Sequence, residues 1–198
     1  MPCWHTNQNR DVFSKEETMY YKSLVFVFLA FLMIPVQRTE SADSKSKNTP
    51  PTSPDPYEIA LADGIIFSNP DYPSFLENVS GMSGREAWGR WSDGKEVVFT
   101  FKKSLPAKFD LVLKASVISS NENKPIPFKV GKWSGSLNMP VGSIDNAKEY
   151  RLHVNNSTKS KEIRITIPNP VQPGTTDTRY LGIAFITMKI IAANQLLN

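Results

Sequence analysis

Apolar and polar side chains alternate with a period close to two along much of the chain between about residue 57 and residue 192. In VVFTFKK at 97–103, Val97, Phe99 and Phe101 occupy every second position. The segment FDLVLKASVIS at 109–119 repeats the pattern, with an apolar set of Phe109, Leu111, Leu113, Ala115 and Val117. Because successive side chains of a strand point to opposite faces of a sheet, both segments are predicted to be strands.

Four more segments of the same kind follow, at 126–131, 149–154, 162–167 and 181–191. The inward sets predicted for the first three are Phe128 and Val130; Tyr150, Leu152 and Val154; and Ile163, Ile165 and Ile167. The last segment, LGIAFITMKII, is apolar on both faces, which is typical of a central strand. No long helical pattern occurs, so we predict an all-β domain, a sandwich of two antiparallel sheets of jelly-roll (galactose-binding-like) type. A closed barrel is the alternative.

The N-terminal region has a different pattern. Residues 24–34, LVFVFLAFLMI, form an apolar run after Lys22 and before a polar stretch that ends in TESA. This predicts a secretory signal peptide over residues 1–42, with the true start of translation at Met19. The run is shorter than the roughly 20 apolar residues that span a bilayer, so we expect no permanent membrane span and a periplasmic or secreted protein. An uncleaved signal anchor is the alternative.

The stretch DSKSKNTPPTSPDP at 43–56 contains no large apolar side chain. Without apolar surface to bury, such a segment does not offset the entropy lost on ordering, so it is predicted to be a flexible linker. The predicted organisation is therefore signal peptide 1–42, linker 43–56, sandwich 57–192 and a tail at 193–198.

The few Cys and His residues limit the chemistry. A single Cys, Cys3, excludes a disulfide scaffold and a Cys-based zinc site. Cys3 and His5 both fall in the predicted signal peptide, which leaves His153, predicted at the surface because it alternates with Leu152 and Val154. We expect no metal site and no cofactor.

The formal net charge is +4, and the lysines are spread over turns and outward strand positions. Proteins that bind nucleic acid carry a concentrated basic surface, often interleaved with aromatic side chains. The scattered charge therefore argues against nucleic acid as a partner.

The richest chemistry lies between Pro70 and Gly94, in PDYPSFLENVSGMSGREAWGRWSDG. Aromatic rings beside planar hydrogen-bonding groups can bind a sugar, whose C–H face packs on a ring while its hydroxyls bond the polar groups. The candidate ligand-binding residues are Arg85, Glu86, Trp88, Arg90, Asp93 and Trp133.

The same residues also fit a structural role. A Trp before a strand often fills the end of a sandwich, so Trp91 is predicted in the core, whereas Trp88 fits either role. Arg90 is expected to bond Glu86 if a turn brings them together. Trp133, in GKWSG, is expected in a second turn, as an exposed platform or as another filling side chain.

Most of this region resembles a known domain. From about Tyr57 to Ile191, and most specifically in LADGIIF, YPSFL, SGREAWGRWSDG and RYLGI, the chain resembles the periplasmic β-sandwich that follows the catalytic part of bacterial phosphoglycerol transferases. These sulfatase-like membrane enzymes decorate periplasmic glucans. The resemblance covers the accessory domain, not the transferase domain with its hydroxyl nucleophile and metal ligands, so it implies an envelope-glycan setting and not transfer itself.

These observations predict a non-catalytic module, with no catalytic residues, that binds a periplasmic glucan or another envelope glycan. One alternative is a protein–protein module that partners a phosphoglycerol transferase or another envelope transferase complex. A glycosidase is the third possibility; it requires two carboxyl groups about 5–10 Å apart across a cleft, for which Glu86 and Asp93 are the candidates.

Overall fold

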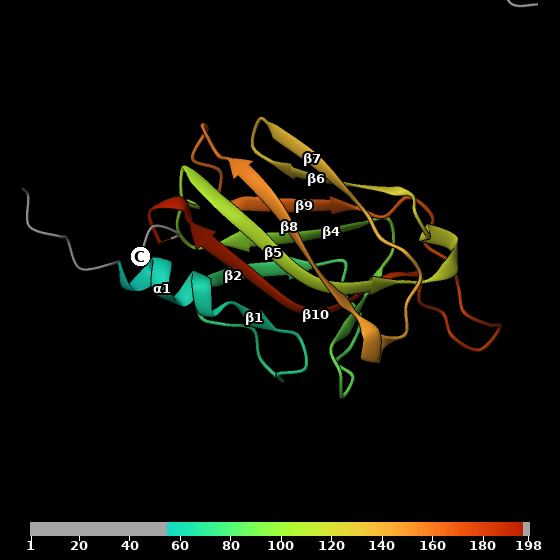
Figure 1. The fold of residues 1–198 in the computed structure, drawn as a ribbon. Coiled ribbons are helices and arrows are strands. Elements are labelled where there is room, and N and C mark those ends of the chain that lie inside the picture. Colours follow the sequence, from blue (N-terminus) through green and yellow to red (C-terminus); the bar gives the residue numbers. More distant parts are fainter. Residues whose placement is uncertain (1–54, 196–198) are drawn as a thin grey trace, which may run out of the picture. The chain divides into compact units, whose positions relative to one another are not determined.

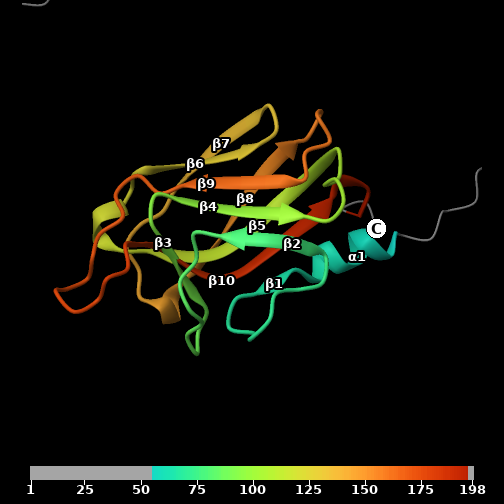
Figure 2. The same cartoon turned by 180° about the vertical axis from the view of Figure 1, so that it is seen from behind.

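The computed structural model describes residues 55–195 as two five-stranded antiparallel sheets packed face to face (Figures 1 and 2). The predicted signal peptide, the start at Met19, the linker up to residue 54 and the end of the tail lie outside the described residues.

The first sheet, which we call the β10 sheet, is built around its longest strand. Its strands are β8 (Lys148–Asn155), β5 (Lys108–Val117) and β10 (Leu181–Ala192), and β10 carries both β1 (Ile65–Ile66) and β3 (Arg90–Asp93) along its other side. The second, the β4 sheet, has the order β2 (Leu76–Ser80), β4 (Glu96–Phe101), β9 (Glu162–Thr166), β6 (Pro125–Val130) and β7 (Trp133–Asn138).

The prediction of an all-β antiparallel sandwich is confirmed. Within residues 55–195 the strands form two separate sheets and not a closed barrel. All six predicted strands are present, and the strand that is apolar on both faces, β10, lies between neighbours as expected.

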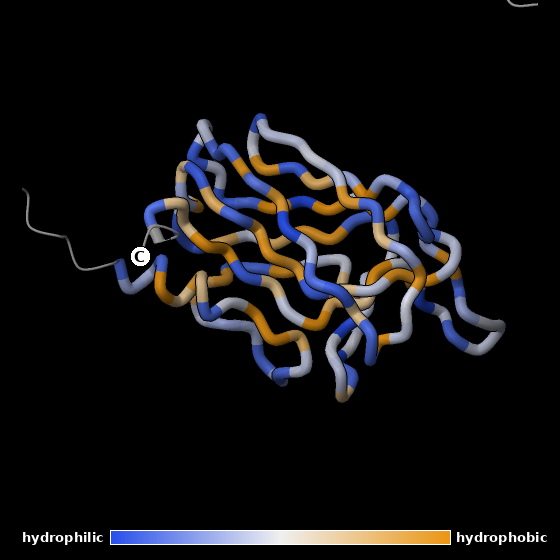
Figure 3. Tube along the Cα trace, viewed as in Figure 1, coloured by the Kyte–Doolittle hydropathy of each residue, from blue (hydrophilic) through white to orange (hydrophobic). Residues whose placement is uncertain are grey.

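The core lies between the sheets and consists of the predicted inward positions. Val97, Phe99 and Phe101 of β4 are each 0% exposed, and the apolar set of β5 packs in the same cluster. Figure 3 shows hydrophobic and hydrophilic positions alternating along these strands. Burial of one face of each sheet is therefore the force that holds the two layers together.

A short helix precedes the sandwich and was not predicted. Helix α1 (Pro56–Asp63) has Asp55 as its N-cap, whose side chain accepts the Tyr57 N–H at 2.9 Å. Asp55 and Pro56, placed in the linker by the sequence pattern, thus begin the helix, and Pro is well suited to a first helical position. The buried residue of this helix is Leu61. One buried position does not produce an apolar stripe of helical period, so the sequence pattern did not reveal the helix.

Three short 3-10 helices complete the described chain: η1 (Ser119–Asn121), η2 (Ile144–Asn146) and η3 (Ala193–Gln195), the last in the predicted tail. Just beyond β10, the Asn194 side-chain amide donates to a Glu58 carboxylate oxygen of α1 at 3.2 Å. The two ends of the described chain therefore meet at one end of the sandwich, while Leu181 starts β10 at the other (Figure 1).

Candidate functional site

The segment between β2 and β3 folds back on itself as a hairpin-like arm. Met82 and Ser92 form an antiparallel bridge, and the Ser83 N–H donates to the Trp91 carbonyl oxygen at 2.9 Å. The hydroxyl of Ser83 in turn accepts the Trp91 N–H at 3.2 Å. These bonds bring most of the predicted ligand residues, which lie at 85–93, to the edge of β10.

Gly89 allows this arm to lie against β10. The next residue, Arg90, pairs with Phe185 of β10, and a Cβ on Gly89 would lie 2.1 Å from the Phe185 carbonyl oxygen. Gly89 also exchanges backbone hydrogen bonds with Glu86, at 2.8 and 3.3 Å, which closes the tip of the arm. Only glycine permits this approach, so Gly89 fixes where the flanking side chains lie.

Four side chains at the tip form a hydrogen-bonded chain, which we call the clamp: Trp88, Glu86, Arg179 and Asp177. The Trp88 Nε1–H donates to Glu86 Oε2 at 2.9 Å, and Arg179 Nη1 donates to Glu86 Oε1 at 3.1 Å. Arg179 also donates to Asp177 through Nε at 2.9 Å and Nη2 at 2.6 Å. Paired bonds of this kind fix orientation as well as adding energy, so the indole of Trp88 is held in place.

The charges of the clamp stabilise one another. Hydrogen bonds from the side chain and backbone of Arg179 lower the pKa of Asp177 to about 2. The pKa of Arg179 is raised, first by its hydrogen bond to Asp177 and then by that to Glu86. Both groups therefore stay ionised over the ordinary pH range.

Trp88 and Trp91 meet edge to face, with ring centroids 5.4 Å apart and planes at 77°. Both residues are half-buried. The prediction that Trp91 lies in the core is wrong: its neighbour Ser92 is 0% exposed and takes the inward position of β3, which directs Trp91 to the opposite face. The two rings together form an aromatic pair at the edge of the sandwich.

The prediction that Arg90 bonds Glu86 is also wrong. The Nη2 of Arg90 donates to the carbonyl oxygens of Asn69 at 3.2 Å and Pro70 at 3.0 Å, and its guanidinium lies 4.9 Å from the ring centroid of Tyr72. Glu86 is at the tip of the arm, whereas Arg90 is already in β3 and reaches the 69–72 loop. Arg90 therefore joins that loop to the sheet.

Arg85 and Asp93 lie in the same arm but contact other segments. Arg85 is exposed and donates through Nη1 to the Ser68 carbonyl oxygen at 3.3 Å. Asp93 Oδ1 accepts the Tyr180 N–H at 2.8 Å. The structure thus joins Glu86 and Trp88 directly, while Asp93 fixes the chain beyond Arg179.

Trp133 does not belong to this cluster. The prediction that it lies in a turn is wrong, since Trp133 is the first residue of β7, at the edge of the β4 sheet. Its half-buried ring packs against the core and covers Gly135, where an added Cβ would lie 2.6 Å from the indole. This contact accords with the filling role that the sequence left open.

A groove of about 530 Å³ lies beside the clamp. The residues that line this groove come from the β3–β4 turn and from the segment between β9 and β10. They are Gly94, Lys95, Pro168, Asn169, Pro170, Val171 and Tyr180. The Gly94 N–H donates to the Tyr180 carbonyl oxygen at 2.8 Å, so the two sides of the groove are joined. Tyr180 is 50% exposed and Val171 is 38% exposed.

Sequence reasoning missed four residues of this region: Lys95, Asp177, Arg179 and Tyr180. These residues lie next to strand ends and outside the aromatic cluster at 70–94, so the sequence did not single them out. Arg179 is also 93 residues from its partner Glu86. The usable signal was DTRYLGI, in which an acid and an arginine two residues apart stand directly before the central strand.

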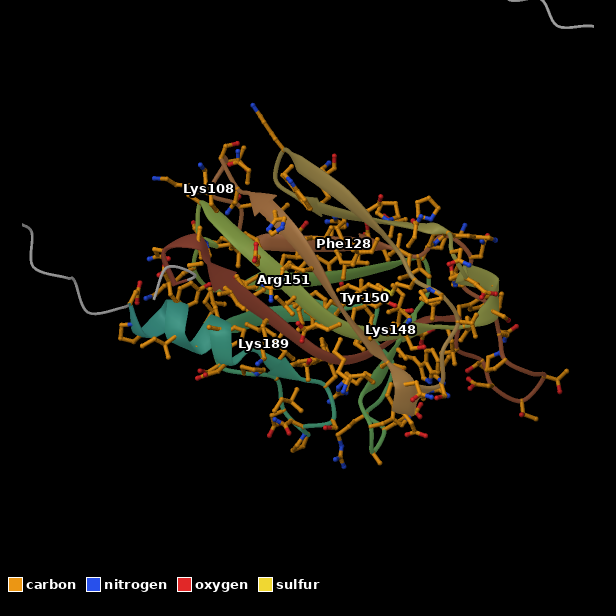
Figure 4. The ribbon with its side chains drawn as sticks, viewed as in Figure 1. Lys108, Phe128, Lys148, Tyr150, Arg151 and Lys189 are labelled. Atoms are coloured by element: carbon orange, nitrogen blue, oxygen red, sulfur yellow. The ribbon has the colours of Figure 1, made fainter. Side chains whose placement is uncertain are left out.

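A second polar cluster lies on the outward face of the β10 sheet. Asp110 of β5 is 5% exposed and accepts Arg151 Nη1 at 2.7 Å, and its other oxygen lies 2.6 Å from His153 Nδ1. Burial alone raises the pKa of Asp110, but the hydrogen bonds from Arg151 and His153 lower it on balance. Figure 4 labels Arg151, on β8 in this layer. His153 is exposed, as predicted, with a side-chain exposure of 82%.

Among residues 55–195, no three His, Cys, Asp or Glu side chains lie close enough together to hold a metal ion. That part of the chain also contains no helix with the length and apolarity to cross a bilayer.

Comparison with known proteins extends these observations. Residues 54–192 match the family described as "Domain of unknown function (DUF7024)". The chain is 35% identical to phosphoglycerol transferase I of Salmonella arizonae over 142 residues, and to the same protein of Salmonella paratyphi B over 138 residues. These matches cover 68% and 66% of this chain but 18% of each relative's length. No solved structure matches the chain. The expected resemblance to a part of these transferases is thus confirmed.

Proposed function

This chain belongs to the DUF7024 family, and we propose that it is a non-catalytic accessory module that binds an envelope glycan at the end of the sandwich that carries the clamp. The relatives are phosphoglycerol transferases, and the match covers 18% of their length. This limited match supports an accessory role in the same setting, with the apolar run at 24–34 supporting a periplasmic or secreted location.

The observation that carries the proposal is the fixed orientation of Trp88. Its ring is half-buried, its Nε1–H is bonded to Glu86, and its face is set at 77° to Trp91. An indole held in advance loses little freedom when a flat apolar surface packs on it, and a pyranose ring offers such a surface. Arg85, exposed in the same arm, adds a donor for sugar hydroxyls.

The position of the acids supports binding over hydrolysis. A glycosidase needs one carboxyl group to donate a proton and another to act as base or nucleophile. Glu86 accepts hydrogen bonds at both oxygens, and Asp93 accepts the Tyr180 N–H. Both candidate acids thus have structural partners within the protein, whereas a catalytic acid has to present its carboxyl group to the substrate.

Titration of the full chain with periplasmic glucans, followed by calorimetry, tests the proposal. We expect Trp88→Ala to weaken binding about tenfold or more, and Trp88→Phe, which keeps an aromatic face, to weaken it less. Trp133→Phe is the matched control and leaves binding unchanged. Absence of binding to every envelope glycan, together with a lowered thermal midpoint for Trp88→Ala, would instead assign the cluster a purely structural role.

The second candidate is a module that partners an envelope transferase. Strand β2 favours it, since within residues 55–195 β2 pairs with β4 alone and its other edge has no strand neighbour. Its exposed side chains, Glu77, Asn78 and Ser80, are polar, however, and polar or charged edges resist pairing with another strand. Co-purification of a transferase with the full chain from cells, and its loss when Asn78 is replaced by Pro, would favour this candidate.

A further inference from the structure

Three polar side-chain groups of the residues that line the groove have no partner among the described residues. Within residues 55–195, the Tyr180 hydroxyl and the Lys95 ammonium have no hydrogen bond or salt-bridge partner. The side-chain amide N–H of Asn169 donates to the Ser120 carbonyl oxygen at 3.2 Å. The side-chain oxygen of Asn169 accepts no hydrogen bond from residues 55–195. The residues that line the groove thus include a hydroxyl, an ammonium and an amide oxygen whose bonding capacity is not used within residues 55–195.

The frame of the groove is rigid. The backbone of Tyr180 is fixed at both ends, because its N–H donates to Asp93 and its carbonyl accepts Gly94. On the other side, the Asn169 N–H donates at 2.9 Å to the side chain of Asn121, which is 0% exposed. A site held in this way loses little entropy when a ligand enters it.

The walls of the groove suit a sugar ring. Pro168, Pro170 and Val171 supply apolar surface, and the half-exposed Tyr180 supplies an aromatic ring. A volume of about 530 Å³ lies in the range of small-molecule sites, which combine apolar walls with a few polar groups that orient the ligand. C–H groups of a pyranose can pack on the ring while its hydroxyls bond Tyr180 and Asn169.

The charge of the groove limits further the class of ligand that fits it. Among the described residues that line the groove, Lys95 alone carries a formal charge, and it is exposed. The nearby acids are occupied: Asp93 binds the Tyr180 N–H, and Glu96 is paired with Arg164. Within residues 55–195 the Lys95 ammonium thus has no salt-bridge partner, which leaves its charge available to an anion beside the aromatic wall.

We propose that this groove binds a sugar unit that carries an anionic substituent, with the sugar ring against Tyr180 and the anion beside Lys95. The inference rests on the proposed function, because it takes the ligand to be a glycan, and it adds a second contact site and a charge preference. A phosphate ester and a phosphodiester share the chemistry that Lys95 recognises.

Glucose and glucose 6-phosphate are probes that differ only in the anionic group. In NMR titrations of the full chain, we expect glucose 6-phosphate to bind about fivefold more tightly, the size expected for one exposed charge pair. Lys95→Gln abolishes this preference and leaves glucose affinity unchanged, whereas Tyr180→Ala weakens binding of both sugars by about tenfold. Lys114→Gln, an exposed lysine of β5, is the matched control and changes neither.

The outcomes separate this inference from the proposed function. A preference for glucose 6-phosphate that survives Lys95→Gln overturns the inference, as does inorganic phosphate binding as tightly as glucose 6-phosphate, which would indicate an anion site only. If glucans bind and depend on Trp88 but not on Tyr180, the inference fails and the proposed function stands. If the wild-type chain binds neither sugar and no glucan, both fail. Unchanged thermal midpoints confirm that each variant is folded.

Discussion

The clamp and the groove are neighbours at one end of the sandwich, but they use their polar groups in opposite ways. In the clamp, Glu86, Asp177 and Arg179 satisfy one another and hold Trp88. In the groove, Lys95 and the Tyr180 hydroxyl have no partner within the described residues. The difference teaches that the charged residues with the richest chemistry in the sequence satisfy one another, whereas a plainer segment beside them has polar side chains without partners in the described residues.

The largest effect should come from the arm that carries the clamp. Gly89→Ala places a Cβ 2.1 Å from the Phe185 carbonyl oxygen, so β3 must shift away from β10. We expect the free energy of unfolding in urea to fall by about 3 kcal/mol. Gly84→Ala, in the same arm with no atom within 4 Å of the added Cβ, is the control and should change it by less than about 0.5 kcal/mol. Equal effects of the two substitutions would contradict the close approach of the arm.

Replacement of Arg179, the cation at the centre of the clamp, should have the next largest effect on stability. Arg179→Met leaves two carboxylates, Glu86 and Asp177, without their shared donor. Hydrogen bonds to charged groups contribute more than neutral ones, so we expect a loss of about 2 kcal/mol in the free energy of unfolding. Arg85→Met, which removes a single bond to the Ser68 carbonyl oxygen, should cost about 0.5 kcal/mol. A clamp that contributed nothing to stability would give the same value for both.

Acid should weaken the clamp selectively. The folded-state pKa of Asp177 is lowered to about 2, below the value of about 4 for an unfolded chain. Its contribution to stability is therefore complete above pH 4 and is lost as the pH falls toward 2. The difference in unfolding free energy between the wild type and Asp177→Asn should shrink over that range. A difference that stayed constant from pH 6 to pH 2 would show that ionisation of Asp177 does not matter.

The groove should give the smallest effect on stability. Lys95→Gln and Tyr180→Ala remove side-chain groups with no partner in residues 55–195, while the backbone bonds of Tyr180 to Asp93 and Gly94 remain. We expect thermal midpoints within about 2 °C of the wild type, equivalent to less than about 0.5 kcal/mol. A larger loss in Tyr180→Ala would mean that the ring supports the fold, and the contrast with the clamp would disappear.

Much of the fold was predictable because the alternation of buried and exposed positions is visible within the sequence of each strand. Each long strand repeats an apolar side chain at every second position, as in Phe109, Leu111 and Leu113, and that period is enough to identify a strand. Strand β7 was missed because its inward positions carry only two large apolar side chains, Trp133 and Leu137, and the glycine and serines between them are typical of turns. It forms because β6 precedes it across a tight turn in which Gly131 has φ +57°, and pairing with β6 satisfies its backbone.

The site was less predictable because its contacts are set by register and not by spacing. The sequence identified Glu86 and Trp88. Arg179, however, comes into contact with Glu86 only because β3 pairs with the start of β10. Arg90 illustrates the same limit, since its nearness to Glu86 in sequence gave the wrong partner. Local patterns indicate which residues have chemistry, and long-range strand pairing decides which of them meet.

The meeting of Glu58 and Asn194 has a mechanical consequence. Strand β10 runs twelve residues from Leu181 to Ala192, which at about 3.3 Å per residue is close to 40 Å. Any polypeptide joined before Asp55 or after Gln195 is thus attached at the far end from Tyr180. A tether at either point therefore leaves the opposite rim of the sandwich facing away from the attachment.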